Sequence, residues 1–153
     1  MLSPSLEDYL EEIYRSYLNN KAIRATDIAQ CLNVTLPSVH HAIQRLSKEG
    51  YLIYERYREI ELSEKGKRAG RFLVERNSIL RELLTLLEVD CNIEQEAEAI
   101  EHYLSLPTIR ALESLLDFLQ KHPSFLQAYL SHCQYRNARG LGLKDTYSHP
   151  CPE

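Results

Sequence analysis

The sequence predicts a mainly α-helical protein, in which an N-terminal winged helix-turn-helix precedes an all-helical domain. Two changes of pattern along the 153 residues support this fold class. Apolar residues recur at helical spacing in three short segments before residue 50, and a stretch rich in aromatic and β-branched residues follows at 51–62. Helical spacing then returns and continues to about residue 133.

Three short helices are expected first, at about residues 5–18, 26–32 and 36–49. Residues that commonly cap helices stand at or near the start of each one, namely Ser5, Thr26 and Thr35. The third helix is expected to end at Gly50, because glycine readily takes the left-handed conformation that follows many helices.

The stretch 51–62 is expected to form a β-hairpin, the wing, with its turn near Arg58 and Glu59. Ser63 is expected to cap a long helix, and further helices follow at about 92–104, 106–122 and 124–133. From residue 136 onward the chain has Gly and Pro without periodicity, which is typical of a flexible tail. The predicted domains are a winged helix-turn-helix over 1–71, a helical domain over 72–135, and a tail over 136–153.

Charge is unevenly distributed, although the whole chain has a net charge of −4. Residues 21–76 contain 11 Lys and Arg against 7 Asp and Glu, whereas residues 77–153 contain 6 against 11. The basic part is suited to an anionic partner and the acidic part to cations.

No apolar stretch approaches the roughly 18 residues of a membrane span, and no basic segment typical of a signal peptide opens the chain. The four cysteines are scattered and form no CxxC pair, as expected for free thiols in a reducing compartment. We therefore expect a cytoplasmic protein.

The basic part predicts binding to double-stranded DNA. In a winged helix-turn-helix the third helix enters the major groove and the wing touches the backbone nearby. Gln pairs with adenine, Ser donates or accepts, and Arg or Lys binds guanine or phosphate. The expected contact residues of the third helix are Thr35, Pro37, Ser38, His40, His41, Gln44, Arg45 and Lys48, and those of the wing are Arg56, Tyr57 and Arg58.

The segment "EAEAIEHYL" places Glu98, Glu101 and His102 at spacing i, i+3, i+4 on one side of a helix. Asp8 and Glu11 share one flank of the first helix in the same way. A carboxylate cluster repels itself without a cation, and carboxylates with one imidazole suit Mn²⁺ or Fe²⁺. The spacing alone favours an ordinary solvated acidic face over a metal site.

Three segments in order, "SLEDYLEEIY", "YLIYERYREIELSEKGKRAG" and "EAIEHYLS", resemble the diphtheria toxin repressor family of metal-dependent transcription repressors. Within that family the chain looks most like the manganese transport regulator branch, over about residues 5–118. The resemblance implies a homodimer that reads a palindromic operator, represses metal-uptake genes and binds two metal ions per subunit, with Mn²⁺ expected. It implies no enzymatic activity, no organic cofactor and no membrane partner. The ligands it implies are Asp8, Glu11, Glu98, Glu101 and His102.

Two positions depart from the family pattern. The family has a histidine where this chain has Asn77, and an amide oxygen is a weaker ligand than imidazole, which predicts a weakened, altered or lost first metal site. Glu59 stands where glycine is usual at the wing tip and would face phosphates unfavourably. A winged-helix regulator with lost or altered metal sensing is therefore the second hypothesis.

Two further interpretations remain open at this stage. A carboxylate–histidine cluster can also serve a metallohydrolase, through metal-bound water. A zinc site in the tail would use His132, Cys133, His149 and Cys151, whose spacing matches no standard pattern.

Overall fold

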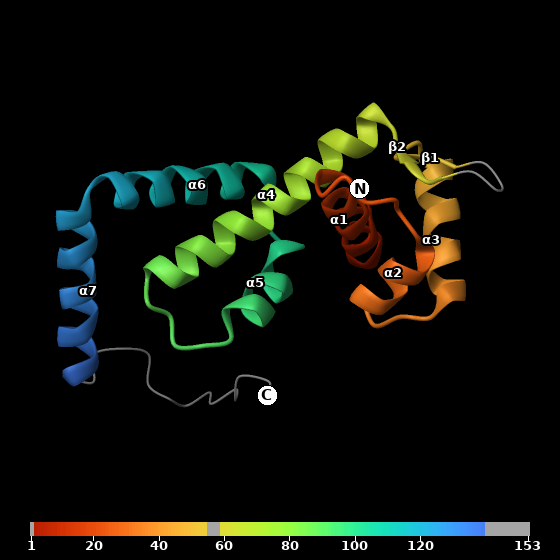
Figure 1. The fold of residues 1–153 in the computed structure, drawn as a ribbon. Coiled ribbons are helices and arrows are strands. Elements are labelled where there is room, and N and C mark those ends of the chain that lie inside the picture. The colour runs from red at the N-terminus through yellow and green to blue at the C-terminus, as the bar shows by residue number, and fades with distance from the viewer. Residues whose placement is uncertain (1, 55–58, 140–153) are drawn as a thin grey trace. The chain divides into compact units, whose positions relative to one another are not determined.

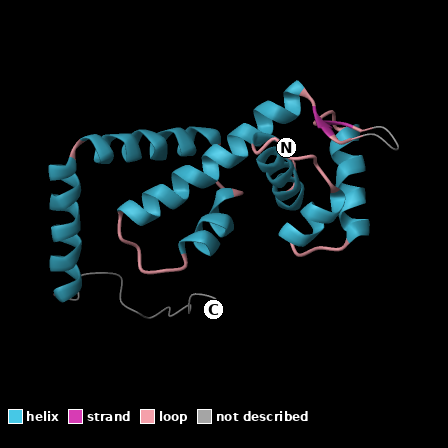
Figure 2. Cartoon of the chain, viewed as in Figure 1, coloured by secondary structure: helices cyan, strands magenta, loops and turns pink. Residues whose placement is uncertain are grey.

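The structure, a computed structural model, describes residues 2–54 and 59–139. Over these residues it contains seven helices and one two-stranded sheet, which confirms the mainly α fold (Figures 1 and 2). The chain divides into two compact units, Met1–Glu75 and Arg76–Glu153. Within the described ranges, no helix has both the length and the apolar character needed to cross a membrane.

The first unit has the predicted element order of a winged helix-turn-helix. Its elements are α1 (Pro4–Leu18), α2 (Ala25–Cys31), α3 (Leu36–Lys48), β1 (Leu52–Ile53), β2 (Glu61–Leu62) and the first part of α4 (Glu64–Leu86). Its core is a single apolar cluster whose most deeply buried side chains are Leu10, Ile13, Ile28, Val39, Ile43 and Leu46. These residues fix α3, so that the opposite side of that helix faces solvent.

Two of the three predicted helix starts are wrong by one residue or more. The first helix begins at Pro4 after Ser3, because proline at the first helical position has no N–H that needs a partner. The second begins at Ala25, and Thr26 lies inside it, where its hydroxyl donates to Asp27 instead of capping. The third prediction is confirmed.

The third helix is capped as expected at both ends. Thr35 Oγ1 accepts a hydrogen bond from the backbone N–H of Ser38 at 3.4 Å. Gly50, directly after the last residues of the helix, has a φ of +79°, which is the left-handed conformation that glycine takes without strain.

The wing is confirmed as an antiparallel pair, but its strands have only two residues each, with Leu52 opposite Leu62. Ser63 joins the base of the wing to α4. Its hydroxyl lies 2.7 Å from the carbonyl oxygen of Gly50, and Oγ accepts from the N–H of Gly66 at 3.0 Å, which confirms the predicted cap. The predicted wing contacts Arg56, Tyr57 and Arg58 lie outside the described residues.

The second unit is built from the rest of α4 together with α5 (Ile93–Glu101), α6 (Leu106–Lys121) and α7 (Pro123–Ala138). One apolar cluster joins α4, α5 and α6 through Leu80, Ala97 and Ile109, and another joins α4, α6 and α7. Asn92 caps α5 as predicted, by accepting from the N–H of Gln95 at 3.2 Å.

Two predicted ends in this unit need correction. The α5 helix ends at Glu101 and not at Leu104, because Tyr103 and Leu104 bond to carbonyls three residues back and close the helix with a turn. The α7 helix continues to Ala138, so residues 136–138 are helical and not part of a tail. No glycine or proline stands between Ser124 and Arg139 to interrupt it.

Candidate metal centre and nucleic-acid interface

The outer side of α3 is polar and basic, as predicted. All the residues expected to contact DNA on this helix are exposed, namely Thr35, Pro37, Ser38, His40, His41, Gln44, Arg45 and Lys48. A shallow hollow lies along the C-terminal half of the helix, lined by His41, Gln44, Arg45, Lys48 and Glu49. This side can therefore present donors and acceptors to base edges and positive charge to phosphates.

The carboxylate of Glu49 reduces the net positive charge of this side of α3. Its carboxylate lies 3.4 Å from Nε of Arg45, one helical turn away, in an exposed ion pair. The backbone carbonyl of Glu49 also accepts a hydrogen bond of 2.7 Å from Lys65, at the start of α4. The C-terminal end of α3 is thus attached to the first turn of α4 within the same unit.

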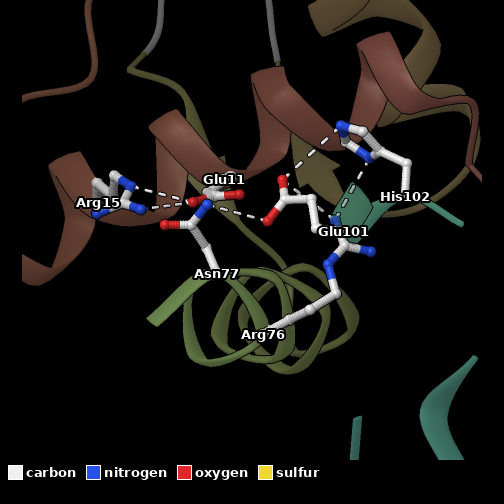
Figure 3. Close-up of polar contacts among 6 residues, drawn as sticks. All are labelled: Glu11, Arg15, Arg76, Asn77, Glu101 and His102. Atoms are coloured by element: carbon white, nitrogen blue, oxygen red, sulfur yellow. Dashed lines mark hydrogen bonds and ion pairs between the residues drawn. The ribbon is translucent and has the colours of Figure 1, made fainter. Parts of the chain in front are cut away.

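In the first unit, Asp8 and Glu11 lie one turn apart on α1, as the spacing predicts. Asp8 is partly buried, and Glu11 is only 7% exposed. Arg15 pairs with Glu11 through Nη2 at 2.6 Å and Nε at 3.2 Å (Figure 3). A buried carboxylate needs such a partner, because an unpaired buried charge is strongly unfavourable.

In the second unit, Glu101 is the most deeply buried of the predicted ligands, at 2% exposed. Asn77 Nδ2 donates to its Oε2 at 3.0 Å, and Arg76 Nη2 lies 3.5 Å from its Oε1. His102, directly after α5, is partly buried, with its Nε2 3.7 Å from the same Oε1. Figure 3 shows these side chains turned toward one another.

The structure thus brings Asn77, Glu101 and His102 together within the second unit, whereas Glu98 is exposed to solvent. The donor set fits a divalent metal ion: carboxylate oxygens and one imidazole are available, and no cysteine is among the predicted ligands. Asn77 uses its amide nitrogen as a donor to Glu101, a role that differs from ligation through its oxygen.

The two arginines beside these carboxylates are residues that sequence reasoning missed. Arg15 follows Glu11 at i+4, the usual spacing of a helical ion pair. Arg76 follows the buried Leu73 by three residues and precedes the buried Leu80 by four, so it stands in the apolar stripe of α4. A lone charge in such a stripe signals a buried ionic partner.

Comparison with known proteins supports the same division of roles. Residues 1–60 match the family model described as "Iron dependent repressor, N-terminal DNA binding domain". Residues 63–128 match the one described as "Iron dependent repressor, metal binding and dimerisation domain".

Curated relatives include an HTH-type transcriptional regulator MntR from Geobacillus thermodenitrificans (strain NG80-2). It is 39% identical over 141 residues, which cover 92% of this chain and 99% of the relative. The MntR of Lysinibacillus sphaericus (strain C3-41) is 38% identical over 128 residues, which cover 83% of this chain and 92% of the relative.

Two solved structures with the same fold are the metal-dependent transcriptional regulator MtsR, with a TM-score of 0.64, and ScaR with bound Zn²⁺, with a TM-score of 0.60; each is 28% identical to this chain. The matches cover 76% and 74% of this chain, and 55% and 54% of the solved chains, so the chain spans about half their length.

The predicted resemblance is confirmed. Because the matched proteins are transcription regulators, the metallohydrolase hypothesis has no support. With both halves matched and close relatives aligned over most of its length, the chain belongs to the iron-dependent (diphtheria toxin) repressor family, in its manganese-regulator branch, whose members bind DNA and divalent metal and dimerise.

Proposed function

We propose that this protein is a Mn²⁺-responsive repressor that binds a palindromic operator as a homodimer and controls genes of metal-ion uptake. The observation that carries the proposal is the buried carboxylate of Glu101 beside His102, in a chain whose α3, the proposed recognition helix, exposes a basic side. The names of the curated relatives support manganese as the metal. Fe²⁺ has similar ligand preferences and is the nearest alternative.

We assign DNA reading to residues 1–71 and metal binding with dimerisation to residues 72–135. The proposed ligands are Asp8 and Glu11 from α1, Asn77 from α4, and Glu98, Glu101 and His102 at α5. A bound ion supplies positive charge that these carboxylates share. Metal binding favours DNA binding only if the ligands are better placed in the DNA-competent arrangement of the protein, which makes the response a shift of population. Since the partner is chromosomal DNA, we place the protein in the cytoplasm.

The test is operator binding with and without metal. A duplex is selected from a random-sequence pool in the presence of Mn²⁺, and its affinity is then measured by fluorescence anisotropy at fixed salt, because salt strongly changes such affinities. We expect tight binding with Mn²⁺ and loss of binding after complete demetallation. Equal affinity of the demetallated protein would refute the metal-responsive part of the proposal.

Replacement of two α3 residues separates backbone contact from base reading. Lys48→Ala is expected to weaken binding to all duplexes alike and to reduce the salt slope by about one, because lysine contacts phosphate. Gln44→Ala is expected to cost roughly 1–3 kcal/mol on the selected operator and to relax its sequence preference at one position. The control Lys21→Ala removes an exposed lysine outside α3 and should change neither quantity. A uniform loss with Gln44→Ala would contradict its role in base reading.

Asn77→His tests the departure from the family pattern. Imidazole is a stronger ligand than an amide, so we expect the variant to bind an additional Mn²⁺ ion or to bind Mn²⁺ at least about tenfold more tightly in calorimetry. Ser78→His places an imidazole at the adjacent exposed position of α4 and serves as control. If Asn77→His leaves stoichiometry and affinity unchanged, Asn77 does not limit metal binding, and the hypothesis of altered sensing loses its basis.

A further inference from the structure

Arg76 is a buried cation of the second unit, with only 3% of its surface exposed. Its guanidinium is permanently charged, so its burial requires anionic or acceptor partners close by. Two such partners come from the end of α5, which is far from Arg76 in sequence but adjacent to it in the fold.

Two of the partners of Arg76 are proposed metal ligands. Its Nη2 lies 3.5 Å from Glu101 Oε1 and 3.4 Å from His102 Nδ1 (Figure 3). The other oxygen of Glu101 accepts from Asn77. Both oxygens of the buried carboxylate and one ring nitrogen of the histidine are therefore already engaged by donors from α4.

The contact with Arg76 determines which ring nitrogen of His102 carries the proton. A guanidinium can only donate, so His102 Nδ1 must be the unprotonated nitrogen, and the proton of the neutral ring is on Nε2. A metal ion bound at Nδ1 would take the lone pair that accepts from Arg76. A metal ion bound at Nε2 would leave the ring proton on Nδ1, where two donors would face each other. Ligation through either nitrogen is thus incompatible with the present Arg76–His102 hydrogen bond.

We propose that Arg76 is a built-in cation that holds Glu101 and His102 in the metal-free protein, and that a divalent metal ion competes with it for these two side chains. The proposal rests on the proposed function, since it takes Glu101 and His102 as ligands. Arg76 is a positioning residue: it keeps the ligand pair ordered without metal and raises the metal concentration at which the pair becomes occupied.

Arg76→Met tests this in the full chain, because methionine retains much of the apolar stem and lacks the charge. In EDTA, thermal unfolding of the variant is expected to occur roughly 10 °C lower, since the buried carboxylate of Glu101 loses the positive charge of Arg76. Calorimetry with Mn²⁺ alone, without DNA, is expected to show binding at least about tenfold tighter, since the ion no longer competes with a nearby positive charge.

Arg81→Met is the matched control. Arg81 on α4 pairs with Glu94 of α5 at 2.7 Å, so it also joins these two helices, but both side chains are exposed. It should change the unfolding temperature and the Mn²⁺ affinity little. Unchanged or weaker Mn²⁺ binding by Arg76→Met would overturn the competition. Failure of the wild-type protein to bind Mn²⁺ would instead overturn the proposed function.

A measurement on the wild-type protein tests the proposed competition even if Arg76→Met does not fold. Nitrogen NMR of His102 is recorded without metal and with Cd²⁺, a diamagnetic probe. We expect an unprotonated Nδ1 and a protonated Nε2 without metal, and direct coupling of one ring nitrogen to ¹¹³Cd²⁺ when this ion binds. A protonated Nδ1 in the metal-free protein, or the absence of coupling to either ring nitrogen when ¹¹³Cd²⁺ is bound, would overturn the proposal.

Discussion

Exchange of Glu101 for glutamine is expected to abolish Mn²⁺-dependent operator binding. Glutamine keeps the size of the side chain but has no charge, and its amide oxygen is a poor substitute for a carboxylate at a divalent ion. Because Glu101 is the most deeply buried proposed ligand, a water molecule cannot readily take the place of its carboxylate at the metal ion. We expect Mn²⁺ affinity in calorimetry to fall by more than about a hundredfold and the anisotropy response to Mn²⁺ to disappear.

Glu96→Gln is the appropriate control. Glu96 lies on the same helix and is exposed, and it is not among the proposed ligands. It removes the same charge from the same acidic segment, so it corrects for the long-range electrostatic part of the effect. Mn²⁺ binding by Glu101→Gln that is no weaker than that of Glu96→Gln would remove Glu101 from the ligand set.

The exchange of Glu101 should also destabilise the metal-free protein. Arg76 would remain buried and charged beside a neutral amide, and breaking a buried pair in this way costs roughly 3 kcal/mol. Thermal unfolding in EDTA measures this effect separately from metal binding. Affinity must therefore be determined well below the unfolding temperature of the variant.

The parts of the fold that follow from local pattern could be predicted from sequence. Apolar residues at helical spacing on α3 place Val39, Ile43 and Leu46 inward, so the opposite residues had to be exposed, and they are. A helix start or end that depends on one residue was also predictable, as at Thr35 and Gly50. The wrong starts of α1 and α2 show that a proline at the start, or a start without a side-chain cap, leaves the first residue of a helix undetermined by local sequence.

The candidate metal centre could be predicted only as a set of residue types. The spacing of Glu98, Glu101 and His102 gives angles around one helix, but it does not give what lies opposite them. That Glu101 is buried and Glu98 exposed depends on packing between α4 and α5. Arg76, which pairs with Glu101, is 25 residues earlier, and no local rule relates two positions so far apart.

Replacement of Gly66 by alanine is expected to destabilise the first unit strongly. In an exposed helix interior the exchange would stabilise by up to about 1 kcal/mol, because alanine is the better helix former. Gly66 is buried in the first turn of α4, and a Cβ at this position would stand 2.0 Å from the carbonyl oxygen of Tyr51. Since that oxygen belongs to the backbone, α4 and the end of α3 would have to separate.

Such a separation would break contacts that join α4 to the end of α3 and the wing. The hydroxyl of Ser63 would lose its bonds to the carbonyls of Gly50 and Tyr51, and Lys65 would lose its bond to the carbonyl of Glu49. We expect a loss of about 3 kcal/mol in the free energy of unfolding, seen as a fall of roughly 10 °C in the unfolding temperature. Operator binding should weaken as well, because the attachment that holds the recognition helix is lost.

Gly50→Ala serves as a control in which the expected loss of stability has a different cause. Nothing lies within 4 Å of a Cβ at Gly50, so the only cost is the left-handed backbone, about 1 kcal/mol. A larger loss for Gly66→Ala than for Gly50→Ala in chemical unfolding would show that close approach of two backbones, and not backbone conformation, requires glycine in α4. If Gly66→Ala were instead as stable as the wild type, α4 could move away from Tyr51 at little cost, and the hydrogen bonds at Ser63 and Lys65 would not fix the recognition helix.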